Sequence, residues 1–204
     1  MTVIKPFASL RREANKRNES MSGGGKWRAL DFVLYLVLIA IILLSVRAVA
    51  LDPVRVDGRS MLDTFTDRDV MLVDRTAYAF STPKRGDVVI CYYPEEYYAS
   101  RELAYASRVK RVIAVAGDVI YTENGRLFVN GEPVDEPYVS PEHAGGYEIG
   151  SAEAPVTISA GCVFVCGDNR RESADSRRAD VGEIPLTRIA GKVRLVLYPK
   201  LRWV

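Results

Sequence analysis

The sequence predicts a mainly β domain, a partly closed barrel, preceded by one N-terminal transmembrane helix. One long apolar segment lies near the N-terminus, and after residue 51 the chain consists of short apolar runs between turn-forming residues. No long stretch after residue 51 has a helical period. The 204 residues are enough for one domain with a real core and an accessory segment.

The first 28 residues form a basic segment. Residues 1–28 hold seven lysine or arginine side chains and two glutamates, whereas the whole chain has a formal net charge of only +2. This near-neutral total gives no sign of nucleic-acid binding. We expect residues 1–28 to be a loosely ordered tail on the cytoplasmic side of a membrane, because basic flanks stay on that side.

Residues 29–51 are almost wholly apolar, with Asp31 near one end and Arg47 near the other. A membrane-spanning helix needs about 20 residues, and charged side chains near its ends can reach the headgroups. The alternative is a cleavable signal peptide, because Ala48-Val49-Ala50 fits a small-x-small cleavage site. The long basic segment and Arg47 favour an uncleaved, single-pass cell-membrane anchor, which places residues 52–204 outside the cytoplasm.

Beyond the anchor the expected elements are β-strands. Asn124-Gly125 and Asn130-Gly131 are strong hairpin signals, because these residue types adopt the positive φ that tight two-residue turns need. They enclose a short strand over 126–129. The other expected strands are 70–73, 88–93, 109–115, 161–166 and 191–198. Short strands between turns predict a single all-β domain.

The cysteines and the histidine do not indicate a metal site or a disulfide. Cysteines are odd in number, and Cys162 and Cys166 in one strand would lie about 13 Å apart, too far to bridge. We expect these two and Cys91 to be buried free thiols. His143, the sole histidine, lies in a turn-rich loop where we expect it to be solvated, so a Ser-His-Asp triad is not favoured.

Ser60 is a candidate nucleophile. It follows Gly58, whose backbone can bend close to a ligand, although a serine in such a turn ordinarily bonds its own backbone. Without a histidine it needs another base, and a buried lysine can lose its proton because desolvation disfavours the ammonium. In an extended strand Lys110 shares a face with apolar neighbours, but so does Arg111. Only the lysine can deprotonate; its other interpretation is a residue at the rim of the core.

A polar segment over 167–177 follows the expected strand 161–166. It concentrates turn formers, hydroxyls and oppositely charged groups. Its composition alone favours a solvated loop with surface ion pairs, each of which contributes little stability. The alternative is a site element in which a hydroxyl orients the base and an Asp–Arg pair braces it.

Three segments in this order resemble the type I signal peptidases, which are membrane-anchored Ser-Lys proteases with a signal-peptidase/LexA-like, β-barrel-type catalytic domain. The match covers about residues 30–195 and is similar to the family's Gram-positive-like branch. The segments are Ser60-Met61, Val109–Ile113 with Gly117-Asp118, and Gly167–Arg177, with further similarity at Asn130-Gly131 and Glu136–Tyr138.

The resemblance implies a serine endopeptidase. Ser60 would attack the scissile carbonyl with its own backbone N–H as an oxyanion donor, and Lys110 would take its proton. Gly58 stands where some members have a further hydroxyl donor, so that donor is absent here. Ser173 would hydrogen-bond the lysine amine. The other implied supports are Gly167, Asp168, and the ion pair of Asp175 with Arg177.

The resemblance also implies the substrates and partners. The substrates would be signal peptides of exported preproteins, bound as extended strands and cleaved after small-x-small (Ala-x-Ala) sites. Val56, Met61 and Val109 are the candidate walls of shallow apolar pockets. The implied partners are membrane lipid and the secretion machinery, with no cofactor, no metal and no nucleic acid.

The sequence departs from the family pattern at three places, one of which is a longer spacing from Arg177 to Gly182 than in many members. Asp63 replaces the usual proline three residues after the nucleophile, and residues 114–118 read Ala-Val-Ala-Gly-Asp instead of Gly-x-Pro-Gly-Asp. A carboxylate near the dyad would favour protonated Lys110 and raise its working pH. We therefore expect a divergent enzyme with a narrow set of clients, such as pilin-like or other surface proteins.

Two other functions stay open at this point. A LexA-type self-cleaving repressor shares the Ser-Lys chemistry, but the anchor and the lack of a DNA-binding segment argue against it. A non-catalytic relative that assists the assembly of surface proteins is supported by Asp63 and opposed by the Ser60/Lys110 pair. Ala48-Val49-Ala50 also allows self-cleavage in trans, which would leave a shorter, soluble form.

Overall fold

The computed structural model describes residues 28–45, 50–99, 107–146 and 148–204. The basic tail except Arg28, and most of the Ala48-Val49-Ala50 tripeptide, lie outside the described residues. Residue contacts divide the chain into two compact units, Met1–Val49 and Ala50–Val204.

The described part of the first unit is a helix, Arg28–Ser45. Its 18 residues are long and apolar enough to cross a membrane, and a helix of this length spans about 27 Å. Its large side chains from Leu30 to Leu44 are all exposed. No other helix in the described ranges meets the same criteria.

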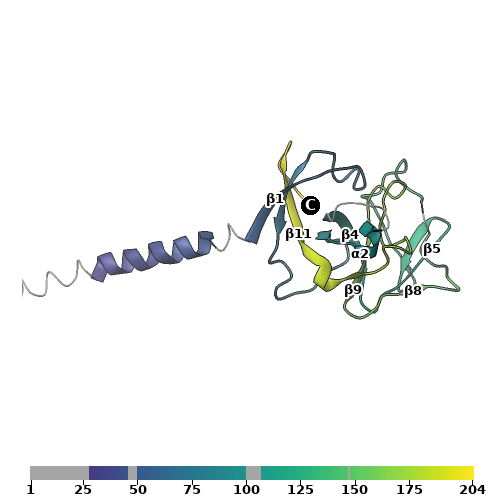
Figure 1. Cartoon of the computed structure of the whole chain (residues 1–204), viewed down its shortest axis with the longest axis horizontal. Coiled ribbons are helices and arrows are strands. Elements are labelled where there is room, and N and C mark those ends of the chain that lie inside the picture. The colour runs from purple at the N-terminus through teal and green to yellow at the C-terminus, as the bar shows by residue number, and fades with distance from the viewer. Residues whose placement is uncertain (1–27, 46–49, 100–106, 147) are drawn as a thin grey trace, which may run out of the picture. The chain divides into compact units, whose positions relative to one another are not determined.

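The second unit is mainly β and is built on a curled, half-barrel antiparallel sheet of eight strands (Figure 1). The strand order is β1-β2-β11-β3-β4-β9-β10, with β12 paired to β11. Bulges interrupt the register of β11 at three places, which bends a strand and increases its twist. The strands are β1 (Leu51–Arg55), β2 (Val70–Asp74), β3 (Val88–Cys91), β4 (Arg108–Val115), β9 (Cys162–Cys166), β10 (Ile184–Pro185), β11 (Ile189–Tyr198) and β12 (Arg202–Trp203).

A smaller sheet holds four strands in the order β7-β6-β5-β8. The turn between β5 and β6 has positive φ at Asn124 (50°) and Gly125 (73°), and the turn between β6 and β7 has it at Asn130 (55°) and Gly131 (82°). Both hairpins predicted from Asn-Gly are therefore confirmed. The strands are β5 (Val119–Glu123), β6 (Arg126–Val129), β7 (Glu132–Pro133) and β8 (Val156–Thr157).

The expected strands correspond to β2, β3, β4, β6, β9 and β11, although β3 ends at Cys91 and not at residue 93. Leu51, expected at the end of the anchor, instead begins β1, where it pairs with Asp74 of β2. The short helix α2 (Glu95–Ala99) and the single-turn η1 (Leu186–Arg188) were not predicted, because five and three residues are too few to show a helical period.

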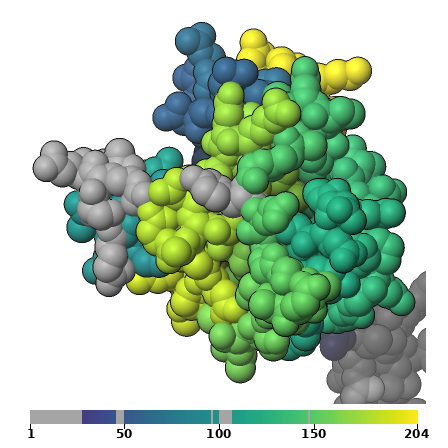
Figure 2. Space-filling model, turned by 90° about the vertical axis from the view of Figure 1, so that its right-hand side faces the viewer, coloured from purple at the N-terminus to yellow at the C-terminus, as the bar shows by residue number. Residues whose placement is uncertain are grey.

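The loop that carries Ser60 is anchored in the hydrophobic core. Met61 and Phe65 are buried on the C-terminal side of Ser60 and Val56 on its N-terminal side, and all three pack with residues of β2, β3 and β11. Arg202 of β12 donates a hydrogen bond to the Thr64 carbonyl at 2.5 Å. Figure 2 shows the C-terminal residues in yellow beside this loop in blue. The loop is therefore held from both sides.

The three cysteines are free thiols, as predicted. Cys91 and Cys166 are buried, and burial raises the pKa of the Cys91 thiol to about 12. Cys162 is partly exposed, so the expectation of burial is wrong for this residue. It begins β9 at the rim of the core, where it pairs with Pro185 of β10.

Candidate active site

Ser60 lies in a closed loop between β1 and β2. Val56 and Asp69 bring the two ends of the loop together through a backbone hydrogen bond of 2.8 Å. Gly58 has φ of +104°, a conformation that only glycine adopts easily, and its N–H donates to Asp67. The Ser60 N–H donates to no acceptor within the described residues.

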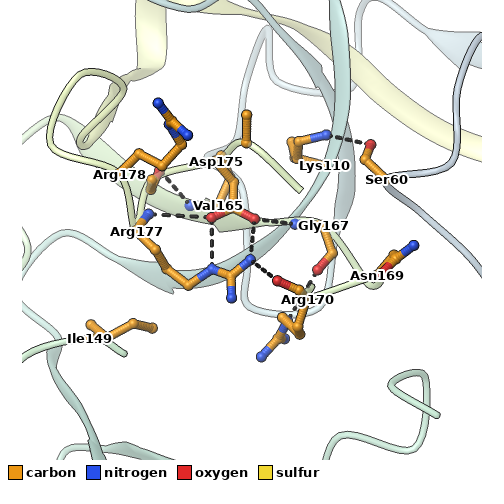
Figure 3. Close-up of polar contacts among 12 residues, drawn as sticks. Ser60, Lys110, Ile149, Val165, Gly167, Asn169, Arg170, Asp175, Arg177 and Arg178 are labelled. Carbon is orange, nitrogen blue, oxygen red and sulfur yellow. Dashed lines mark hydrogen bonds and ion pairs between the residues drawn. The ribbon is translucent and has the colours of Figure 1, made fainter. Parts of the chain in front are cut away.

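Lys110 of β4 points at Ser60, although fifty positions separate the two residues (Figure 3). Its Nζ lies 2.7 Å from Ser60 Oγ and 2.9 Å from the Val109 carbonyl oxygen. Lys110 is 2% exposed, and this burial lowers its pKa below the ordinary value of 10.5. The pair therefore has the geometry of a hydroxyl beside a base, and burial favours the neutral form of that base.

Most of the polar segment over 167–177 is buried, with Arg171 and Glu172 exposed, so the solvated loop favoured by composition is wrong. Asp168, Asn169 and Asp175 are each at most 1% exposed. Asn169 holds the Ser60 loop at two points: its N–H donates to the Ser60 carbonyl and its side chain donates to the Arg59 carbonyl, both at 3.1 Å. A β-carbon on Gly167 would collide with the Ser60 carbonyl and with Ser173, so this approach requires glycine.

Asp175 and Arg177 form a buried ion pair (Figure 3). Arg177 donates to the two Asp175 oxygens at 2.8 Å each, and the Gly167 N–H donates to the same carboxylate at 3.0 Å. Burial alone would raise the pKa of Asp175, but the Arg177 hydrogen bonds and charge outweigh it and lower the pKa. Arg177 also donates to the Arg170 carbonyl at 2.8 Å, which fixes the loop against itself.

Ser173 lies close to this network without bonding the lysine. Its residue is 4% exposed, and its buried Oγ meets no hydrogen-bond partner by distance and angle within the described chain. It is still near enough to Asp175 to contribute weakly to the lowered pKa of that carboxylate. The bond from Ser173 to Lys110 that the resemblance implies is therefore not formed in this structure.

A second buried pair, which the sequence did not reveal, joins Asp168 to Arg111. Arg111 donates to the two Asp168 oxygens at 2.9 and 2.7 Å and to the Gly86 carbonyl at 3.0 Å. Thr64 of the Ser60 loop donates to Asp168 at 2.5 Å. Arg111 also stacks on the Tyr138 ring, 4.0 Å from its centre. This pair connects the Ser60 loop, β4 and the polar segment.

A cavity of about 540 Å³ opens beside Ser60 and Lys110. Val56, Met61 and Val109, the three expected pocket walls, all line it, together with Tyr93, Tyr97 and Ala174. Its rim also carries charged residues, which sequence reasoning missed. They are Arg55, Asp57, Arg59, Arg108 and Glu172.

His143 is not the solvated residue that its loop predicted. Its side chain is 15% exposed, and its Nε2 lies 3.4 Å from an Asp63 carboxylate oxygen and 3.7 Å from Glu142. Asp63 therefore faces the 140–146 loop, and it is not among the charges with the largest influence on Lys110. The expectation that Asp63 acts on Lys110 finds no support in this arrangement.

Comparison with known proteins identifies the family. Residues 29–198 match the family model described as signal peptidase, peptidase S26. A signal peptidase I of Bacillus amyloliquefaciens is 31% identical over 187 residues, 90% of this chain and 95% of that protein. A signal peptidase I of Bacillus licheniformis is 32% identical over 185 residues, with coverage of 89% and 95%.

A crystal structure of a signal peptidase I from Enterococcus faecalis V583 aligns at 24% identity with a TM-score of 0.40, over 55% of this chain and 98% of that one. The assignment rests on the family model and on the relatives above 30% identity, which cover most of the chain. On these matches, the chain belongs to the signal peptidase family, peptidase S26.

Proposed function

We propose that the protein is a signal peptidase I that cleaves N-terminal signal peptides from exported preproteins by a Ser60–Lys110 dyad. The observation that carries this proposal is the 2.7 Å contact between Lys110 Nζ and Ser60 Oγ, with the lysine 2% exposed. A buried amine with a lowered pKa is neutral over more of the pH range than a solvated lysine. It can therefore accept the serine proton.

In the first half of the reaction Ser60 Oγ bonds to the scissile carbonyl carbon while its proton passes to Lys110 Nζ. The carbonyl oxygen becomes an oxyanion that the Ser60 N–H can bind, since this donor is not used within the described chain. The ammonium then gives its proton to the leaving amine as the peptide bond breaks. This step leaves an ester on Ser60 and a neutral Lys110.

In the second half Lys110 removes a proton from a water molecule, which attacks the ester carbonyl. The ammonium returns this proton to Ser60 Oγ as the ester breaks, which restores the starting state. Asp168, Asp175 and their arginines do not meet the reacting atoms in this scheme. Asp175 accepts a hydrogen bond from the Gly167 N–H, and Asp168 accepts one from Thr64 of the Ser60 loop, so the two carboxylates hold the polar segment beside that loop.

The walls of the cavity suit the proposed small-x-small specificity. Val56 and Met61 are 6% and 2% exposed, and with Val109 they form an apolar surface beside the dyad. Such walls favour alanine-sized side chains next to the scissile bond. We further propose that the Arg28–Ser45 helix anchors the protein in the membrane, with the basic N-terminus cytoplasmic and the β domain outside. Membrane lipid and the secretion machinery are the partners that this topology implies.

The test is cleavage of a preprotein that carries one Ala-x-Ala site, by the purified full-length chain in detergent. We expect wild type to release a fragment whose mass places the cut directly after the second alanine, and Ser60→Ala to release none. A folded wild type that leaves the preprotein intact, or a Ser60→Ala variant that cuts at the same bond, would contradict the proposal.

A further inference from the structure

Arg108, the first residue of β4, lies in the wall of the cavity and is half-buried. Its Nε is shielded from solvent and has no hydrogen-bond partner in the ranges that the structure describes. Buried polar groups are nearly always hydrogen-bonded, and a shielded charged donor without an acceptor is costly. A group that enters the cavity from outside could supply this acceptor.

The Arg108 side chain lies near Lys110 along the same strand. Arg108 stands two residues before Lys110 on the same extended strand, so the two side chains leave the strand on the same face. Their α-carbons are about 7 Å apart at the usual rise of a strand. A peptide held with its scissile bond at Ser60 would thus bring neighbouring side chains within reach of Arg108.

The carboxylates already present on the cavity wall do not meet this need. Glu172 lies 4.0 Å from Arg59, with both side chains more than half exposed. Neither Glu172 nor Asp57 forms a hydrogen bond or ion pair with Arg108 among the described residues. The guanidinium is thus left for the ligand.

We propose that Arg108 determines specificity by binding a carboxylate side chain of the peptide substrate close to the scissile bond. The planar guanidinium presents paired N–H donors that match the two oxygens of a carboxylate, and a shielded setting strengthens such a pair. The inference rests on the proposed function and narrows its substrates to those with Asp or Glu near an Ala-x-Ala site. Val56, Met61 and Val109 would take the small side chains, and Arg108 the acidic one.

A carboxylate bound to Arg108 would also change the pKa of Lys110. Burial is the main cause of the lowered pKa of Lys110, and the positive charge of Arg108 lowers it further. A carboxylate bound to Arg108 offsets that charge and raises the pKa of Lys110. The kcat profile, which reports groups in the enzyme–substrate complex, should then rise at higher pH with an acidic substrate than with a neutral one.

The experiment uses the full-length protein in detergent and a set of Ala-x-Ala peptides. Each peptide carries one glutamate at a different position around the scissile bond, and each has a matched peptide with glutamine there. At one position or more we expect wild type to prefer glutamate by at least about tenfold in kcat/KM. In Arg108→Gln the ratio should fall to about one, and the pH shift of kcat between the two peptides should disappear.

Arg55→Gln is the matched control, because it removes an equal charge from the exposed rim of the same cavity. We expect Arg55→Gln to keep the glutamate preference. Equal cleavage of all pairs by wild type would overturn the inference, as would a preference that survives Arg108→Gln. An equal loss of the glutamate preference in Arg108→Gln and Arg55→Gln would show a general electrostatic effect of the cavity. This result would also overturn the inference.

Binding separates this inference from the proposed function. Fluorescence anisotropy with Ser60→Ala measures the affinity for each labelled peptide without cleavage. A preference for glutamate in this assay supports the role of Arg108 even if no peptide is cut, whereas cleavage without any such preference would leave only the proposed function standing. Where Arg108→Gln does not fold, Arg108→Lys keeps the charge and should retain a reduced preference, since a single ammonium cannot pair with both oxygens.

Discussion

Gly167 approaches the Ser60 carbonyl so closely that a β-carbon on Gly167 would collide with the carbonyl oxygen. The same β-carbon would also collide with the Ser173 side chain. The contact joins the polar segment after β9 to the loop that carries the nucleophile. The same loop is fixed by Asn169, which bonds the Arg59 and Ser60 carbonyls. The position of Ser60 thus depends on a residue without a side chain more than one hundred positions away.

Gly167→Ala is expected to lower kcat/KM by at least about a hundredfold, because a displacement near 1 Å at the nucleophile has such an effect. Gly182→Ala is the control: its β-carbon would meet nothing, but its φ of +59° strains alanine. We expect Gly182→Ala to lose about 1 kcal/mol of stability and to keep its activity when folded. Steady-state kinetics and thermal unfolding of both variants decide this. Near-normal kinetics in Gly167→Ala would show that the loop position is not critical.

The Arg111–Asp168 pair should behave as a buried ion pair. Arg111→Met leaves the 0%-exposed Asp168 side chain without its cation, which is expected to cost about 3 to 5 kcal/mol of unfolding free energy. The double variant Arg111→Met/Asp168→Leu, which removes both charges, should recover most of the lost unfolding free energy. Arg75 pairs with Asp52 on the surface, so Arg75→Met should cost less than about 1 kcal/mol. Denaturant unfolding measures all three, and equal losses at the two arginines would refute the distinction.

Lys110 is expected to lower the stability of the protein at neutral pH. Burial lowers its folded pKa below 10.5, so between the two pKa values the unfolded chain binds more protons and stability rises with pH. The destabilisation is full below the folded pKa and is relieved by up to about 1.4 kcal/mol per pH unit as the pH rises to 10.5.

Lys110→Met, which has no amine to titrate, should therefore be more stable than wild type at neutral pH, and the gap should close in alkaline solution. Thermal unfolding across this pH range provides the measurement. A Lys110→Met protein that is less stable at every pH would mean that the bonds of Lys110 to Ser60 and Val109 outweigh its desolvation.

Asp63 should have no effect on the working pH of the site. Its carboxylate lies 3.4 Å from His143 Nε2, is 57% exposed on its side chain, and is not among the charges with the largest influence on Lys110. We expect Asp63→Asn to leave the pH–rate profile unmoved. Arg108→Gln is the positive control. Because the Arg108 charge lowers the pKa of Lys110, its loss should move the rise of the rate with pH to a higher pH. If Asp63→Asn moves the rise of the rate to a lower pH, then the Asp63 carboxylate does favour protonated Lys110, as the departure from the family pattern suggested.

The sequence predicted the strands because they are local patterns, and it predicted that Ser60 and Lys110 lie together from chemistry and the family resemblance. Strands such as Val88–Cys91 show as apolar runs between turn residues, and Lys110 could be chosen over Arg111 by chemistry alone. The interactions that hold the site join distant positions, and nothing in the residues themselves pairs Asp168 with Arg111. Composition even misled, because a segment rich in charges was expected at the surface, whereas most of it is buried and its buried charges are paired.

His143 and Arg108 show the same limit. A histidine between prolines and glycines gives no sign that a loop eighty positions earlier covers it. Arg108 stands out because its shielded Nε has no acceptor among the residues that the structure describes, which a structure can reveal and a sequence cannot.

The central claim is that Lys110 is the general base for Ser60, and the pH dependence of preprotein cleavage tests it most directly. We would measure kcat/KM of wild type from roughly pH 6 to 10, with Lys110→Ala beside it. The account predicts activity that rises with pH around a midpoint below 10.5, since burial lowers the pKa of Lys110, and no cleavage by the folded variant. A rise centred at or above 10.5, or a Lys110→Ala variant that keeps the wild-type profile, would contradict it.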